Sequence, residues 1–206
     1  MFLSSRKTLK LRQRLVKLFA PKLYVDIVDM TNIRRLIDTT PRPMTLFLKE
    51  RSKNEELVGV EIGVAKGNNA LSLLEELSIR KLFLVDPYMP YLDRGQRVSS
   101  KGSSIIAQNK LSSFRQVQFV KKTSKDAVKD VGGPLDFVYI DGNHSCEYVK
   151  NDIALYYPLV KAGGVIGGHD YVPYHDAGVF QAVNEFVQER GRLGFYAVFP
   201  DWWVVK

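Results

Sequence analysis

The sequence predicts an α/β fold in which a mostly parallel sheet carries helices on both faces, and three observations lead to it. From Leu57 onward, short runs rich in β-branched residues alternate with segments of helical spacing, which is the pattern of βαβ units. The runs are almost continuously apolar, as in strands that are buried on both faces. The 206 residues, 45% of them hydrophobic, suffice for one sizeable core.

Five apolar runs are candidates for parallel strands, and a hairpin follows them. The strand candidates are residues 57–63, 81–86, 117–120, 135–141 and 163–168. Helical spacing occupies residues 68–77, 125–130, 148–159 and 179–190. The C-terminal segments FYAVF and WWVVK flank the turn Pro200-Asp201, which predicts an antiparallel hairpin. Residues 88–104 lack periodicity, and a segment of that length is typical of a functional lid or of disorder.

Composition divides the chain into a tail, a helical cap and one domain. Residues 1–22 hold seven basic residues and no acid, which leaves 23 basic against 22 acidic residues elsewhere. The leucines of this tail are interleaved with Arg and Lys up to Pro21, which predicts an amphipathic basic helix. Residues 23–54 carry helical spacing and predict an N-terminal helical cap that is too short to fold alone. Residues 55–206 form the main domain.

Two interpretations of the tail remain open at this point. It attaches to an anionic membrane surface or partner, or it packs its leucines on its own domain or on a second subunit, as in a homo-oligomer. The nearly neutral remainder of the chain argues against a broad nucleic-acid groove. Cys146 is the only cysteine, which excludes an intrachain disulfide and a cysteine-based zinc cluster. A reducing, cytoplasmic setting fits, with the tail as a candidate for peripheral membrane contact.

The turn after the first strand contains Gly63 and Gly67, where the strand passes into a helix. Glycine lets a ligand approach the backbone closely, although tight strand-to-helix turns also use glycine for structural reasons alone. Ala65 and Asn68 stand where a dinucleotide fingerprint needs glycine, so a pyrophosphate cradle is disfavoured.

The second strand ends in Asp86, a position from which an acid can bind ribose hydroxyls. The alternative is a turn or cap residue, because Asp-Pro is favourable turn chemistry. A glycine turn that does not suit pyrophosphate, combined with a ribose-binding acid, indicates an adenosine ligand without phosphates. S-adenosylmethionine is the obvious candidate.

The fourth and fifth strands end in Asp141-Gly142-Asn143-His144 and in His169-Asp170. The carboxyl ends of parallel strands meet at one edge, so Asp141 and Asp170 can converge on one point with His169 beside them. Carboxylates suit Mg²⁺, Ca²⁺ or Mn²⁺, and a histidine shifts the preference toward a transition metal. Either aspartate alone also serves as a helix cap. His144 next to a cation is a suitable general base.

Four stretches together resemble a known family, the class I S-adenosylmethionine-dependent methyltransferases of the macrocin O-methyltransferase and cephalosporin hydroxylase-like group. The resemblance covers residues 55–206, and its most specific part is the segment from Asp141 to Tyr171. The stretches are VGVEIGVAKGNNALSLLEEL, KLFLVDPY, LDFVYIDGNHSCEYVKNDIALYYPLVKAGGVIGGHDY and GVFQAVNEF.

This resemblance implies a Rossmann-like, doubly wound, seven-stranded sheet whose last strand is antiparallel. It also implies roles for individual residues. Glu61, Gly63 and Gly67 would contact the methionine end of the cofactor, and Asp86 would bind its ribose. Asp141 would border the cofactor and, with Asp170 and the neighbouring His169, bind a divalent metal such as Mg²⁺ or Mn²⁺. His144 would be the base.

Three functions are consistent with these residues. The leading one is methyl transfer to a hydroxyl of a small molecule, such as a sugar or a glycosylated natural product. The second is RNA methylation, suggested by the basic tail and by Arg94, Arg97 and Lys101 in the lid. It is weakened because the fourth strand lacks the (Asn/Asp)-Pro-Pro-(Tyr/Phe) motif that binds an exocyclic amine. The third is a catalytically inactive, membrane-associated binding module with the same fold.

Overall fold

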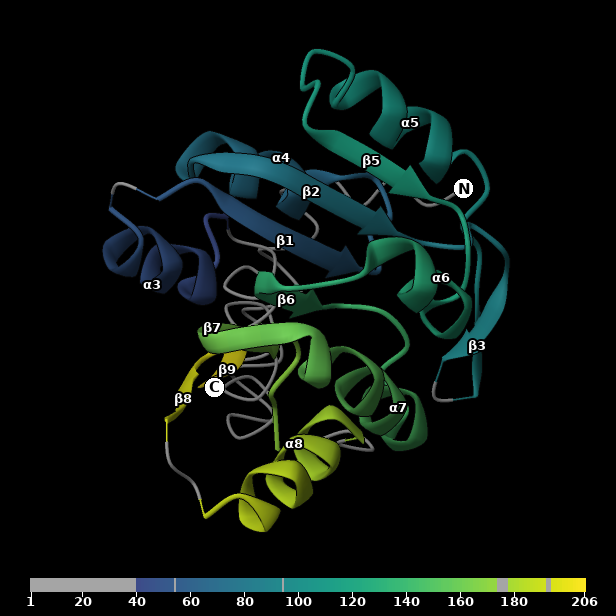
Figure 1. Cartoon of the computed structure of the whole chain (residues 1–206). Helices are drawn as coiled ribbons and strands as arrows, with labels where there is room; N and C mark the ends of the chain where they lie inside the picture. Colours follow the sequence, from purple (N-terminus) through teal and green to yellow (C-terminus); the bar gives the residue numbers. More distant parts are fainter. Residues whose placement is uncertain (1–39, 54, 94, 174–177, 192–193) are drawn as a thin grey trace, which may run out of the picture. The chain divides into compact units, whose positions relative to one another are not determined.

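The computed structural model describes residues 40–206 apart from 54, 94, 174–177 and 192–193. Its centre is a seven-stranded sheet in the order β5-β2-β1-β6-β7-β9-β8 (Figure 1). Neighbouring strands pair in parallel except at β9, which is antiparallel to both β7 and β8. In chain order the strands are β1 (Leu57–Ile62), β2 (Ile79–Val85), β5 (Val117–Val120), β6 (Leu135–Ile140), β7 (Val160–Gly168), β8 (Phe195–Val198) and β9 (Asp201–Val205).

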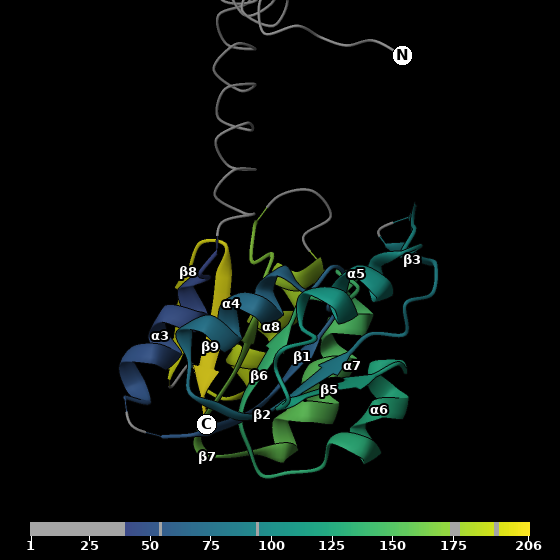
Figure 2. The same cartoon turned by 90° about the horizontal axis from the view of Figure 1, so that it is seen from above.

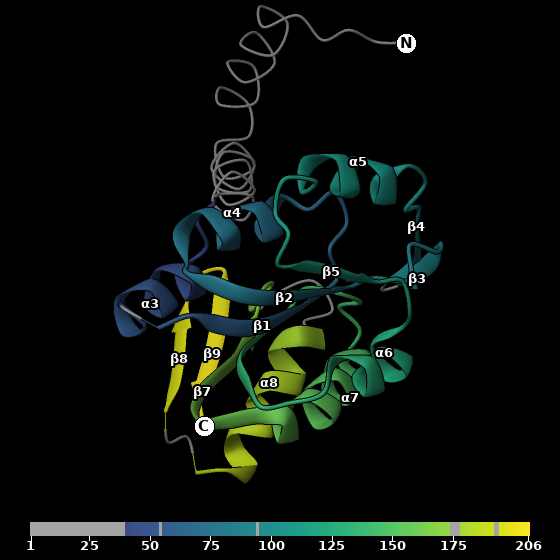
Figure 3. The ribbon, with the colours of Figure 1, turned by 45° about the horizontal axis from the view of Figure 1, so that its top comes forward.

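Helices cover both faces of this sheet (Figure 3). Side chains of β6 alternate between the two layers: Phe137 and Tyr139 pack in one hydrophobic cluster, and Val138 and Ile140 pack in the other. This double burial is the reason that the strands are apolar at nearly every position. One layer contains α3 (Pro43–Arg51), α4 (Asn68–Glu76) and α5 (Ser103–Lys110), and the other contains α6 (Ser124–Val131), α7 (Cys146–Tyr156) and α8 (Gly178–Glu189).

The predicted parallel strands, the closing hairpin and the antiparallel last strand are confirmed. The segment 88–104 is more ordered than expected. It contains a small antiparallel sheet of β3 (Tyr91–Asp93) and β4 (Gln96–Val98), and α5 begins at its end. This hairpin lies beyond the end of the sheet toward which β1 and β2 point (Figures 1 and 2). Strands of three residues and a helix that buries only Ser103 and Ala107 leave no recognisable period in the sequence.

The helix α3 is attached to the sheet through Asp201, the first residue of β9. This side chain is 0% exposed. Its Oδ2 accepts a hydrogen bond from the Met44 amide at 3.0 Å, and its Oδ1 accepts one from the Tyr139 hydroxyl at 2.9 Å. Burial raises the pKa of Asp201 to about 7, although both of these hydrogen bonds lower it. The C-terminal strand therefore fixes the start of a helix that comes before the first strand in the sequence.

Several sequence predictions fall on residues outside those that the structure describes. These are the basic tail 1–22, the first part of the cap up to residue 39, and Arg94 in the lid. The described part of the cap is α3. Within the described ranges, no helix combines the length and the apolar character that crossing a bilayer requires.

We expect Asp201→Ala to lower the free energy of unfolding by about 2–4 kcal/mol. The substitution leaves the Met44 amide and the Tyr139 hydroxyl buried without an acceptor, and each such group costs roughly 1–3 kcal/mol. Urea denaturation measures the change. Asp130→Ala is the matched control, because Asp130 pairs with Lys122 on the exposed surface and contributes little. Equal stability of the two variants would show that Asp201 does not anchor α3.

Candidate active site

The carboxyl ends of β1, β2, β6 and β7 carry the residues that the sequence singled out. The chain proceeds from β1 outward to β2 and β5, and then adds β6 and β7 on the other side of β1. In α/β sheets this reversal marks the place where ligands bind. The structure places Gly63, Asp86, Asp141 and Asp170 at the ends of these strands.

The turn after β1 approaches the backbone that follows β6. Gly63 has a φ of +86°, and a Cβ at this position would collide with the carbonyl group of Asp141. The amide of Asp141 donates to the carbonyl of Ile62 at 2.7 Å. Gly67, with a φ of +71°, directly precedes α4. Gly63 is therefore required by the close approach of two chain segments, and Gly67 by the left-handed turn before the helix.

The carboxylate of Asp86 holds this turn. Its Oδ2 accepts from the amides of Val64 and Ala65 at 3.0 and 2.9 Å, and its Oδ1 accepts from the amide of Tyr88 at 2.7 Å. Ala65 has a φ of +46°, which residues other than glycine rarely adopt. Asp86 is thus a turn-stabilising residue in this structure, and ribose binding by the same carboxylate stays a prediction.

Glu61 lies beneath the turn and is 1% exposed. Asn69 Nδ2 donates to its Oε1 at 3.1 Å, while its Oε2 has no hydrogen-bond partner among the described residues. Burial raises the pKa of Glu61 to about 8, against the lowering effects of Asn69 and Arg42. The neutral acid is therefore favoured unless a positive charge approaches.

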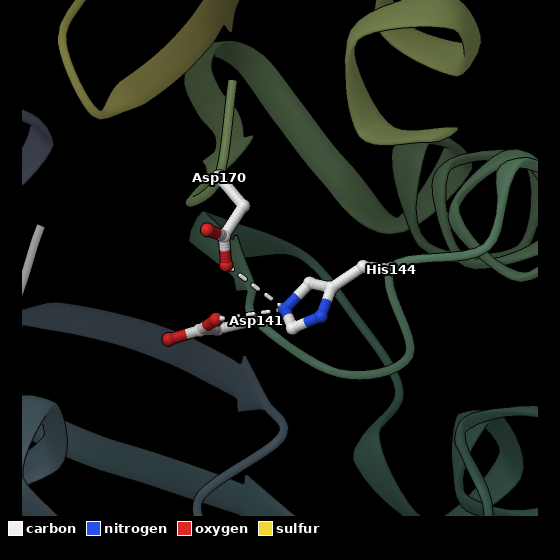
Figure 4. Close-up of side chains that lie close together, drawn as sticks. All are labelled: Asp141, His144 and Asp170. Atoms are coloured by element: carbon white, nitrogen blue, oxygen red, sulfur yellow. Dashed lines mark ion pairs between the residues drawn. The ribbon is translucent and has the colours of Figure 1, made fainter. Parts of the chain in front are cut away.

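Asp141, His144 and Asp170 form a compact cluster (Figure 4). His144 Nε2 lies 2.9 Å from Asp170 Oδ2 and 3.6 Å from Asp141 Oδ1. One ligand atom from each residue lies within 4.8 Å of the other two. Two carboxylates and an imidazole at this spacing can hold a divalent cation.

His169 adds a second imidazole to the same carboxylates. Its Nδ1 lies 3.1 Å from Asp170 Oδ2 and 3.8 Å from Asp141 Oδ1. The side chain is 3% exposed, whereas that of His144 is 19% exposed. His144 is therefore the histidine that a ligand reaches more easily.

Asp93, which β3 brings to His144, is a site residue that the sequence pattern did not predict. Asp93 Oδ1 accepts from the His144 amide at 3.0 Å, and Asp93 Oδ2 lies 2.7 Å from His144 Nδ1. Beside this pair, Asn143 Nδ2 donates to the carbonyl of Leu92 at 2.8 Å. The hairpin is thereby attached to the loop that carries His144. An acid within a long irregular segment was the only sequence signal for it.

Three carboxylates set the charge of His144. Burial lowers its pKa, but the interactions with the carboxylates of Asp141, Asp170 and Asp93 outweigh burial and raise the pKa to about 12. His144 is therefore an imidazolium at neutral pH while these carboxylates are charged. An imidazolium cannot accept a proton, so a role as base requires a compensating positive charge near the aspartates.

A cavity of about 290 Å³ lies beside the cluster. The glycine turn, the end of β2, the loop after β6 and the hairpin segment all contribute to its wall, and Thr123, Ser124 and Asp152 line it as well. The hairpin residues Tyr91 and Val98 show that the segment 88–104 borders the cavity. Cys146 is half-buried at the start of α7 and is not among the lining residues.

The sheet order and the antiparallel last strand define a Rossmann-like methyltransferase fold. A family model described as a methyltransferase domain matches residues 60–171, more than half of the chain, and the protein belongs to this family.

Solved structures of the same fold share little sequence with this chain. An O-methyltransferase from Bacillus cereus, solved in complex with SAH, is 16% identical with a TM-score of 0.60 and covers 88% of this chain and 89% of its own. The O-methyltransferase NovP is 17% identical with a TM-score of 0.56, covering 86% of this chain and 79% of its own. MycE, a methyltransferase of mycinamycin biosynthesis, is 15% identical with a TM-score of 0.54, and the match covers 79% of this chain but only 48% of MycE.

A curated relative comes from a virus. Uncharacterized protein R132 of Acanthamoeba polyphaga mimivirus is 29% identical over 143 residues, which is 66% of this chain. The match spans 62% of the length of that relative.

We expect Asp93→Asn to lower the pKa of His144, because it removes one of the carboxylates that favour the imidazolium. NMR titration of the histidine side chains in the metal-free protein measures the change, and a His144→Asn variant assigns the signal. Asp126→Asn, at an exposed position in the first turn of α6, is the control. An identical His144 titration in Asp93→Asn and in the wild type would contradict this role of Asp93.

Proposed function

We propose that the protein is an S-adenosylmethionine-dependent O-methyltransferase for a hydroxyl of a small molecule, with a sugar or glycosylated natural product as the acceptor. The observation that carries the proposal is that one cavity is lined both by Asp86, at the ribose position, and by Asp141, in the charged cluster. A nucleoside at one end is thus adjacent to groups that can handle a proton at the other. MycE, a methyltransferase of mycinamycin biosynthesis that was solved with Mg, SAH and mycinamycin VI, supports a natural product as the acceptor. A place near the macrocin O-methyltransferase group is proposed from the sequence stretches alone.

When bound, S-adenosylmethionine supplies an electrophilic methyl group on its sulfonium. The residues of this chain bind and orient it. The turn at Gly63 and Gly67 leaves the backbone open to close approach, and Asp86 offers acceptors to the ribose hydroxyls. Glu61, with its unpartnered Oε2, fits the methionine end of the ligand, and Asp141 borders the cofactor and the acceptor.

Proton transfer from the acceptor hydroxyl falls to His144. Asp93 engages Nδ1, so Nε2, which faces Asp141 and Asp170, takes the proton. The two aspartates fit a divalent cation, and the neighbouring imidazole of His169 favours Mn²⁺ over Mg²⁺. Such a cation would offset the carboxylate charge that keeps His144 protonated.

Isothermal titration tests cofactor binding. We expect the wild type to bind S-adenosylmethionine and Asp86→Ala to bind it roughly tenfold or more weakly, because charge-assisted hydrogen bonds contribute about 1.5–3 kcal/mol. A cofactor analogue without the two ribose hydroxyls should lose less affinity than S-adenosylmethionine on this substitution, because only the effect of Asp86 on the turn remains. A wild type that does not bind S-adenosylmethionine would refute the proposed function, and unchanged affinity in folded Asp86→Ala would refute only the ribose contact.

Removal of metal should abolish methyl transfer, and Mn²⁺ or Mg²⁺ should restore it, because His144 stays protonated without a cation. Release of SAH in a screen of hydroxylated compounds identifies an acceptor for this assay. In the metal-loaded enzyme, His144→Ala should lower turnover by about 10²–10⁴-fold with nearly unchanged cofactor affinity. Activity that does not change with EDTA would show that no divalent metal is required. A fully active His144→Ala variant would show that His144 is not the general base.

A further inference from the structure

Arg42 is a buried cation, and two of its three side-chain nitrogens lack a hydrogen-bond partner among the described residues. It stands directly before α3 and is 8% exposed. Its Nη2 lies 3.9 Å from Asp141 Oδ2, too far for a hydrogen bond. Its Nε and Nη1 have no hydrogen-bond partner among the described residues. A guanidinium has five N–H donors, and unpaired buried donors are costly, so an acceptor that pairs with Nε and Nη1 would stabilise Arg42.

Other unpartnered buried atoms belong to the elements around Arg42. Glu61 Oε2, Asn69 Oδ1 and Thr45 Oγ1 have no hydrogen-bond partner in the described part of the chain. Glu61 and Asn69 are bonded to each other, and the charge of Arg42 lowers the pKa of Glu61. Thr45 lies in α3, one helical turn after Arg42. The set therefore combines donors on the side of α3 with acceptors on β1 and α4.

The charge pattern of these atoms selects one ligand chemistry, the zwitterion of an α-amino acid. A carboxylate offers acceptors to the Arg42 guanidinium and the Thr45 hydroxyl, and an ammonium offers donors to Glu61 and Asn69. A phosphate would also pair with Arg42, but it would bring further negative charge close to Asp141 and Glu61. A neutral ligand would bring no negative charge to the guanidinium, whose ion pair with Asp141 spans 3.9 Å.

We propose that Arg42 binds the α-carboxylate at the methionine end of the cofactor and so selects nucleosides that carry an amino-acid group. The inference rests on the proposed function. Asp141 connects the two regions, because it lines the cavity and its Oδ2 faces Arg42. The planar guanidinium can present two parallel N–H groups to a carboxylate, which a lysine cannot do.

Two ligands separate recognition of the carboxylate from recognition of the nucleoside. SAH carries the amino-acid group, and 5′-methylthioadenosine has the same nucleoside without it. By isothermal titration of the full chain, we expect Arg42→Gln to weaken SAH binding roughly tenfold or more and to change binding of 5′-methylthioadenosine by less than about twofold. Arg42→Lys, which keeps the charge without the planar group, should lose less affinity for SAH.

Arg51→Gln is the matched control variant. Arg51 also belongs to the α3 region, but its guanidinium donates to the carbonyl of Gly163 at 3.2 Å and is exposed. This variant should bind both ligands like the wild type. Circular dichroism confirms that each variant is folded before titration.

Two results would overturn the inference: wild-type affinity for SAH in Arg42→Gln, or an equal loss of affinity for both ligands, which would make Arg42 a structural residue. If Arg42→Gln does not fold, the test is made on the wild type by comparing its affinity for SAH with its affinity for decarboxylated SAH. This analogue keeps the nucleoside and the ammonium. Equally tight binding of SAH and this analogue would refute carboxylate recognition. A wild type that binds neither nucleoside refutes the proposed function itself, whereas tight binding without an effect of Arg42 refutes only this inference.

Discussion

The contact between the Gly63 turn and the backbone of Asp141 constrains the rest of the site. No side chain fits at residue 63, because its Cβ would collide with the Asp141 carbonyl. The pairing of β1 with β6 continues through this point, where the Asp141 amide donates to the Ile62 carbonyl. The turn that would face a cofactor and the loop that carries His144 are thereby held together. The spacing between the Gly63 turn and the start of the loop that carries His144 is thus set by the pairing of the sheet.

The site concentrates acids, and this has an electrostatic consequence. Burial raises the pKa of both Glu61 and Asp141, and the carboxylates around His144 keep that residue protonated. Each of these shifts lowers the net negative charge of an interior that stabilises ions poorly. A ligand that brings positive charge, such as a sulfonium or a divalent cation, is therefore favoured here, and a pyrophosphate is repelled. The sequence also disfavours a pyrophosphate ligand, because Ala65 and Asn68 stand where the dinucleotide fingerprint needs glycine.

The sequence was sufficient to predict the features that follow from hydrophobic periodicity and from the order of the strands. Apolar runs located the parallel strands, and residues at their carboxyl ends, such as Asp141 and Asp170, had to share one edge. It was insufficient for contacts that depend on how a connection folds back. Asp93 reaches His144 only because a short exposed hairpin forms within an irregular segment. The place of Asp86 at the end of the second strand was predictable, yet its bonds to the Val64 and Ala65 amides depend on the conformation of the turn.

The position of Arg42 beside the candidate active site depends on contacts made by the last strand. Asp201, at the start of β9, binds the amide of Met44, two residues after Arg42. The antiparallel insertion of β9 between β7 and β8 brings Asp201 to Tyr139 of β6, which ends next to Asp141. The position of Arg42 beside Asp141 therefore depends on a strand at the opposite end of the sequence. An antiparallel strand at this place in a parallel sheet thus serves the site as well as the core, because it anchors the segment that delivers a buried positive charge.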